Sequence, residues 1–184
     1  MEIDLKKLSE IVSDHVINLT EEDIFDFLKM TYRWPYRYPW NQTSVEIITG
    51  FGNNSSDYFF DRLGRFQYDE WKKYYDEGFT TILSNVMDLT PQLRSLSSKI
   101  FKFSGNEING NFYFSKGSKD HRVSFPGHSH EYPVIVKPIY GNCTWILGNE
   151  ELKNPKETFI ILSNTIHSVD EGPNKRLSLT LNIE

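Results

Sequence analysis

The sequence predicts an α+β fold, mainly β, in which helices precede an antiparallel barrel or double sheet. Before about residue 105, apolar residues recur at helical spacing behind helix-capping residues. Beyond Asn106, the chain becomes a series of short runs rich in β-branched and aromatic residues. Glycine, asparagine and proline separate these runs at intervals typical of hairpins, so a closed sheet is the natural arrangement of the second half.

The length of the chain, 184 residues, is about that of one domain and allows a sizeable core. Hydrophobic residues at 38% and charged residues at 24% are close to ordinary globular usage, which predicts a folded chain. We therefore expect a single domain over residues 1–184. In it, an N-terminal helical region, residues 1–105, packs on a barrel core formed by residues 106–184.

The charge pattern and the N-terminus limit the partners of the chain. Its net charge is −5 and its lysines and arginines are scattered, which predicts no direct contact with nucleic acid. The N-terminus lacks an apolar signal region, no long apolar span follows, and Cys143 is the single cysteine. We therefore expect a cytoplasmic protein that has no intramolecular disulfide and no membrane partner.

Helix signals are clear in the first half. Residues 3–16 carry apolar side chains close to helical spacing, and Thr20 is a predicted N-cap ahead of acidic first-turn residues. Residues 68–79 indicate a helix that ends near a glycine. Thr90, with Pro91 at the first helical position, begins another helix.

The remaining segments are predicted as one loop and several strands. Residues 33–44 are aromatic and contain Pro35 and Pro39, which remove backbone donors and exclude a regular helix, so we expect an ordered loop. Residues 80–86 are predicted to form a short buried strand. The strands predicted for the second half cover residues 110–117, 131–141, 143–148, 157–163 and 176–183.

Three histidines are the candidate functional residues. His128 and His130 are separated by one residue, so on an extended strand both imidazoles leave the same face, and His167 follows a second apolar strand at a turn. Three neutral imidazoles that converge suit iron, zinc, copper or nickel. The alternative is a pair of exposed histidines in a turn after Pro126-Gly127, but His167 and the surrounding strands favour a metal site.

The order of these residues resembles the JmjC-type cupins, and within them the ribosomal oxygenase-like hydroxylases that use Fe(II) and 2-oxoglutarate. The resemblance covers roughly residues 66–184. The thirteen-residue step from His128 to Gly141, followed by a Trp-Ile-Leu strand, matches the spacing usual in that family. The other matching positions are Gly78-Phe79-Thr80, Pro91, Asn111-Phe112-Tyr113-Phe114-Ser115, His128-Ser129-His130 and His167.

The resemblance implies a double-stranded β-helix (cupin or jelly-roll) core and an Fe(II)/2-oxoglutarate-dependent hydroxylase. The iron ligands would be His128, His130 and His167, and Asn111 and Tyr113 would line the co-substrate pocket. The alternative for Asn111 and Tyr113 is an ordinary alternating strand that packs one face into the barrel. The substrate would be a protein, a peptide or a small molecule, and a homodimer is possible.

Two positions depart from the family pattern. His130 stands where the family has a carboxylate ligand, so the site would contain three histidines. Cys143 stands where relatives place a lysine or arginine for the distal carboxylate of 2-oxoglutarate, and a thiol cannot make that charge-assisted hydrogen bond.

Two other cations are candidates for the missing anchor. Arg176 lies nine residues beyond His167, the spacing at which many other 2-oxoglutarate oxygenases place an anchoring arginine, although a surface arginine would give the same pattern. Lys137 is a second candidate if strand alternation points it into the barrel.

Two further functions remain open. The first is a three-histidine metal cupin, a dioxygenase or isomerase, that does not use 2-oxoglutarate. The second is a catalytically degenerate JmjC-like module that binds a partner. In that case, His130 and Cys143 would be substitutions that followed the loss of catalysis.

Overall fold

A computed structural model describes residues 3–32, 44–49, 52–54, 56–118 and 123–184. The predicted aromatic loop, residues 33–44, lies outside this part of the chain except for Ser44. Within the described residues, no helix is long and apolar enough to cross a membrane.

Four helices form where the sequence predicts them. Thr20 and Asp23 make reciprocal side-chain to backbone hydrogen bonds at the start of α2, and the Thr90 side chain accepts from the Leu93 amide ahead of α4. Helix α4 ends at Gly105, whose φ of 74° is in the left-handed region that favours glycine. The helices are α1 (Leu5–Asp14), α2 (Glu21–Met30), α3 (Tyr68–Asp76) and α4 (Pro91–Ser104), with short 3₁₀ turns at η1 (Ser56–Phe59) and η2 (Val86–Asp88).

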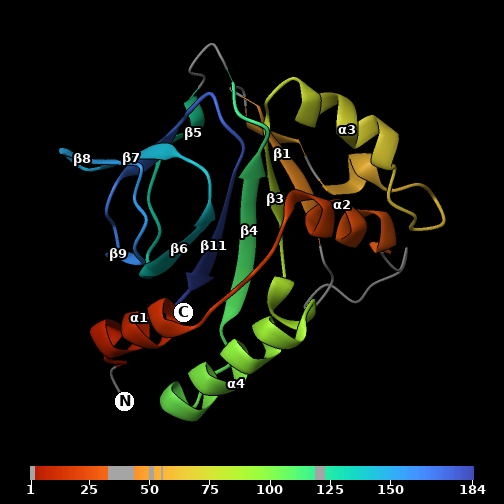
Figure 1. Cartoon of the computed structure of the whole chain (residues 1–184). Helices are drawn as coiled ribbons and strands as arrows, with labels where there is room; N and C mark the ends of the chain where they lie inside the picture. The colour runs from red at the N-terminus through yellow and green to blue at the C-terminus, as the bar shows by residue number, and fades with distance from the viewer. Residues whose placement is uncertain (1–2, 33–43, 50–51, 55, 119–122) are drawn as a thin grey trace.

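The strands form two sheets, as Figure 1 shows. The larger sheet has seven strands in the order β2-β1-β3-β4-β11-β6-β9, and the smaller has four in the order β5-β10-β7-β8. All the pairings between these strands are antiparallel. The strands are β1 (Val45–Thr49), β2 (Gly52–Asn54), β3 (Thr80–Leu83), β4 (Asn109–Ser115), β5 (Val123–His128), β6 (Val134–Tyr140), β7 (Cys143–Leu147), β8 (Glu150–Lys153), β9 (Phe159–Ile161), β10 (His167–Glu171) and β11 (Arg176–Asn182).

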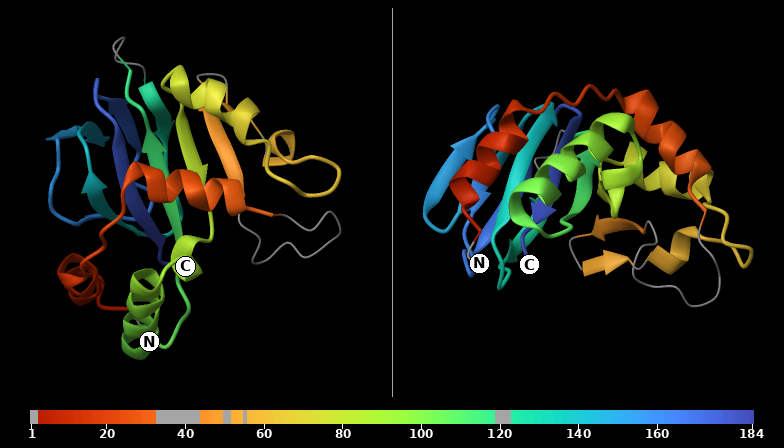
Figure 2. Two further views of the ribbon diagram at one scale, coloured as in Figure 1. Left: turned by 45° about the vertical axis from the view of Figure 1, so that its right-hand side comes forward. Right: turned by 90° about the horizontal axis from the view of Figure 1, so that it is seen from below.

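The two faces of the larger sheet have different partners. Alternate residues such as Phe112 and Leu179 are fully buried in the main core together with apolar residues of all four helices, and Figure 2 shows α1 and α4 side by side against this sheet. The opposite face of β4, β11 and β6 turns toward the smaller sheet. There, Val134, Val136 and Trp145 belong to a second, smaller cluster between the sheets. This inter-sheet space is the interior of the barrel.

The N-terminal hundred residues are less purely helical than predicted. They supply β1, β2 and β3 to the larger sheet, although only β3 is predicted as a strand. Strands β5, β8 and β10 are also absent from the predicted strands. Their polar or charged residues and the Pro126-Gly127 pair give no strand signal in the sequence. These segments form strands because they pair with neighbours in the smaller sheet.

Candidate metal centre

The two strands that carry the histidines lie next to each other in the smaller sheet. His128 is the last residue of β5 and His167 is the first residue of β10, and the two are directly paired across these antiparallel strands. Paired residues point to the same face, so both imidazoles enter the barrel. His167 therefore begins a strand, whereas the sequence predicts it at a turn; the turn lies before it, between β9 and β10.

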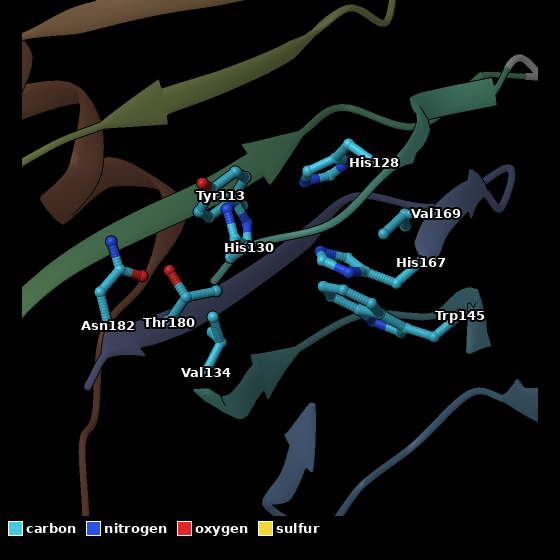
Figure 3. Close-up of a pocket in the computed structure, with 9 residues that line it drawn as sticks. All are labelled: Tyr113, His128, His130, Val134, Trp145, His167, Val169, Thr180 and Asn182. Carbon is cyan, nitrogen blue, oxygen red and sulfur yellow. The ribbon is translucent and has the colours of Figure 1, made fainter. Parts of the chain in front are cut away.

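The third histidine joins this pair, and the three rings converge (Figure 3). The ring centroids of His128 and His167 are 4.2 Å apart, and His130 lies 5.0 Å from His128 and 5.3 Å from His167. One ring nitrogen of each residue lies within 4.8 Å of those of the other two. Because metal–imidazole bonds are about 2.0–2.1 Å long, this donor set fits one divalent transition-metal ion.

Backbone carbonyls set the orientation of two of the rings. The Nδ1 atoms of His128 and His167 lie 2.9 Å from the carbonyl oxygens of Pro126 and Thr165. A carbonyl oxygen can only accept, so each Nδ1 carries the proton and each Nε2 keeps its lone pair for a metal. Such outer hydrogen bonds are typical of metal-binding histidines. Sequence reasoning missed both carbonyls, although each belongs to the residue two positions before its histidine.

Burial keeps two of the histidines neutral. Burial lowers the pKa of His130, and the neighbouring His128 lowers it further. Burial also lowers the pKa of His167; the Thr165 hydrogen bond opposes this shift, and the other two histidines add to it. The lone pairs are therefore available to a metal at neutral pH.

These lowered pKa values predict a pH-dependent stability of the metal-free protein. Above pH 6.5, the ordinary histidine value, both rings are neutral in the folded and unfolded chains and contribute no pH dependence. Below it the unfolded chain binds protons first, so the free energy of unfolding should fall as the pH drops through the folded pKa values. Urea unfolding at several pH values measures this. A His167→Gln variant should show a shallower fall, and an equal fall would contradict the assignment.

The three histidines line a partly open pocket of about 320 Å³, which we call the metal pocket. Trp145 stacks on His167 at an interplanar angle of 27°, and Val134 and Val169 add apolar walls. The other wall is polar but uncharged. It consists of Tyr113, Thr180 and Asn182, which Figure 3 shows beside His130 on β4 and β11.

Tyr113 is a neutral hydrogen-bonding group in this wall. Burial, with a smaller contribution from the Glu46 charge, raises its pKa to about 12. The phenol therefore keeps its proton at neutral pH.

Arg176 lies in a second cavity of about 250 Å³, the arginine cavity. Its side chain is 3% exposed and Nη2 donates to Thr80 Oγ1 at 3.1 Å, so it is no surface arginine. Trp145 lines both cavities, whereas Arg176 does not line the metal pocket. The arginine cavity is also lined by Cys143, Ser178, Tyr140, Pro138, Gly141, Pro155 and Leu177.

Ser178 is a polar residue of this cavity that sequence reasoning missed. Its side chain is 4% exposed, and Oγ has no hydrogen-bond partner among the described residues. Buried hydroxyls are usually satisfied, so this atom is an unmet hydrogen-bonding group at the cavity. The signal was available in the sequence, because Arg176 and Ser178 are two apart on a strand and share a face.

Lys137 and Asn111 differ from their predicted roles. The expectation for Lys137 is wrong, because it points out of the barrel and its Nζ donates to the carbonyls of Val12 and Ser13 at the end of α1, each at 3.0 Å. Asn111 is buried on the interior face opposite Thr180, but it does not line either cavity.

Comparisons with known proteins support the fold at low sequence identity. No family model and no curated protein matches the sequence. Two solved structures of YcfD, a ribosomal oxygenase from Escherichia coli, each align over 93% of this chain. Their TM-scores are 0.64 and 0.61, at 7% and 12% identity. The chain has a cupin fold.

A third YcfD structure, in complex with cobalt and succinic acid, aligns over 93% of this chain with a TM-score of 0.59 and 11% identity. This chain spans slightly less than half of the length of YcfD, 45–47% of it in the three structures. At these identities the likeness shows the fold alone. The resemblance to the JmjC-type cupins is thus supported at the level of architecture.

Proposed function

We propose that this protein is a metal-dependent oxygenase that holds Fe(II) through His128, His130 and His167 and uses 2-oxoglutarate as a co-substrate. The observation that carries the proposal is the convergence of three imidazoles inside the barrel, two of them oriented by backbone carbonyls. A degenerate binding module has no need to keep this arrangement. The proposed substrate is a side chain of a protein or peptide, or a small molecule.

The chemistry of the metal and that of the protein are distinct. When bound, Fe(II) and 2-oxoglutarate supply the oxidising power that transfers an oxygen atom from O2 to a C–H bond. The chain holds the metal with three ligands and leaves the remaining positions to small molecules. Val134, Trp145 and Val169 wall this centre with apolar side chains, and the neutral Tyr113 phenol is a hydrogen-bonding group beside it.

The arginine cavity favours the proposed use of 2-oxoglutarate as the co-substrate. A dicarboxylate needs a cation for its far end, and Arg176 presents a buried guanidinium beside the Ser178 hydroxyl. Along β11, side chains of one face repeat about every 6.6 Å, and the interior face carries Thr180 in the metal pocket followed by these two residues. The complex of YcfD with cobalt and succinic acid is a parallel for a metal and a dicarboxylate bound to one protein.

One observation favours a second candidate, a three-histidine oxygenase or isomerase that binds its substrate directly on the metal. Among the described residues that line the metal pocket, none is an aspartate, glutamate, lysine or arginine. An Fe(II) centre with only neutral ligands keeps its full charge and would attract an anionic substrate without any other cation.

Metal analysis followed by an anaerobic titration separates these candidates. Protein purified without chelator should contain a divalent metal, and the Fe(II) form should develop a charge-transfer absorption band as 2-oxoglutarate is added. Metal without the band would favour the second candidate. A protein that binds no metal would contradict both.

A further inference from the structure

Cys143 lies in the cavity that would hold the distal carboxylate. It is the first residue of β7, half-buried, and it lines the arginine cavity together with Arg176. The Ser178 hydroxyl of the same cavity has no hydrogen-bond partner among the described residues, which is an independent indication that a polar ligand binds here. The single thiol of the chain therefore lies inside a candidate ligand site.

The turn before Cys143 fixes its position relative to Arg176. Gly141 has a φ of 86°, and a Cβ there would lie 2.8 Å from the Arg176 Cβ, so the β6–β7 turn lies directly against the start of β11. Lys156 Nζ holds this turn by donating to the Gly141 carbonyl at 3.1 Å and to Asn142 Oδ1 at 2.6 Å. The thiol thus follows a turn that packs against the start of β11 and is tied to the segment between β8 and β9.

Cys143 shares its cavity with the Arg176 guanidinium, a hydrogen-bond donor for anions. Among cysteine species, the thiolate is the form that reacts with peroxides. Partial exposure of Cys143 gives a small oxidant access to the sulfur. An oxygen atom added to this sulfur would accept hydrogen bonds from Arg176, as a carboxylate oxygen does.

We propose that Cys143 is a peroxide-sensitive modification site, whose reversible oxidation occupies the arginine cavity and blocks the distal carboxylate of the co-substrate. In this step the thiolate sulfur attacks a hydroperoxide, an S–O bond forms, and the O–O bond breaks. The leaving hydroxide or alkoxide takes up a proton. The sulfur is oxidised by two electrons to a sulfenic acid and the peroxide is reduced. The regulatory effect rests on the proposed use of 2-oxoglutarate.

The test compares 2-oxoglutarate binding before and after oxidation of the same protein. Metal-free protein is treated with hydrogen peroxide, freed of the excess, loaded with Fe(II) anaerobically and titrated with 2-oxoglutarate. Oxidation should weaken binding by about tenfold or more, because the anchor loses a charge-assisted hydrogen bond, and dithiothreitol should restore it. Dimedone, which traps sulfenic acids, should add one mass increment at Cys143.

Two variants isolate the thiol. In Cys143→Ser, peroxide treatment should leave 2-oxoglutarate binding where it was before the treatment. Cys143→Asp mimics an anionic oxygen beside Arg176 and should bind 2-oxoglutarate about tenfold or more weakly than Cys143→Asn, which has the same shape without the charge. Equal binding by the aspartate and asparagine variants would overturn the proposal even if one oxidised sample aggregates.

Failure of this proposal and failure of the proposed function give different results. If reduced wild-type protein with bound Fe(II) shows no band, then 2-oxoglutarate is not the co-substrate, and the regulatory step is overturned with it. If the reduced protein shows the band and the oxidised protein binds 2-oxoglutarate equally well, only the role of Cys143 is overturned.

Discussion

Replacing His167 with alanine should abolish tight metal binding. The residue is 5% exposed and supplies one of three ring nitrogens, so the variant keeps two ligands and a gap beside Trp145. Loss of an outer-sphere partner alone typically lowers metal affinity 10- to 100-fold, so loss of a ligand should lower it on the order of 100-fold or more. Anaerobic titration with Co(II), followed by its visible absorption, measures the affinity.

His15→Ala is the matched control for this variant. His15 is a similarly buried histidine, 8% exposed, but its ring nitrogens contact the Gln92 carbonyl and Lys99 Nζ on α4, away from the metal pocket. The control should lose some stability because it leaves the Gln92 carbonyl without this partner, yet it should bind Co(II) as the wild type does. Equal loss of metal in both variants would mean that general destabilisation, and not a missing ligand, explains the result.

The histidine cluster is the part of the site that sequence reasoning approaches most closely. The spacing of His128 and His130 predicts two side chains on one face of a strand, but β5 ends at His128 and His130 lies beyond it. The ring of His130 reaches the cluster from the segment after the strand. Their meeting with His167 depends on the pairing of β5 with β10, which is long-range. Spacing alone does not encode this pairing. The expectation came from the apolar strands around the histidines, and the resemblance to a family with the same order of residues strengthened it.

The helices were predicted well because their signals are local. Caps at Thr20 and Thr90 and a proline at the first position of α4 act within one turn of the chain. Strand β8, with the sequence Glu-Glu-Leu-Lys, lacks any such signal, and it is a strand because β7 offers it backbone hydrogen bonds. Its charged residues suit the edge of a sheet, where they discourage pairing with another chain.

The polar interior of the barrel shows how the two kinds of information combine. Strands β4 and β11 pair Asn111 with Thr180, Tyr113 with Ser178, and Ser115 with Arg176. These residues alternate with apolar ones that face the helices, so the sequence pattern alone separates the two faces. Which strand then closes over the polar face, and where two cavities remain, depends on packing by Trp145 and its neighbours. Arg176 was predicted from its spacing after His167, and strand alternation would have added Ser178 on the same face; only the packing shows that both line one cavity.

Arg176→Met should lose the 2-oxoglutarate band at concentrations that saturate the wild type, while metal binding persists. Methionine fills a similar volume and leaves no buried charge, but it removes the guanidinium from the arginine cavity. A hydrogen bond to a charged group contributes about 1.5–3 kcal/mol, so co-substrate affinity should fall about 10- to 100-fold. Titration of the Fe(II) form with 2-oxoglutarate, alongside Co(II) binding, separates the two effects.

Lys137→Met is the matched control for Arg176→Met. It also replaces a long cationic side chain by methionine, but on the face of the sheet that turns away from the barrel interior. Lys137 donates to carbonyls at the end of α1, and burial lowers its pKa, so the variant should change stability slightly and leave the band intact. If both variants lose the band, the loss reflects the sheet and not the arginine cavity. If neither variant loses the band, the co-substrate is anchored elsewhere. The uncharged metal pocket then favours the second candidate, which binds its substrate directly on the metal. Only a loss confined to Arg176→Met ties the spacing nine residues beyond His167 to a carboxylate anchor.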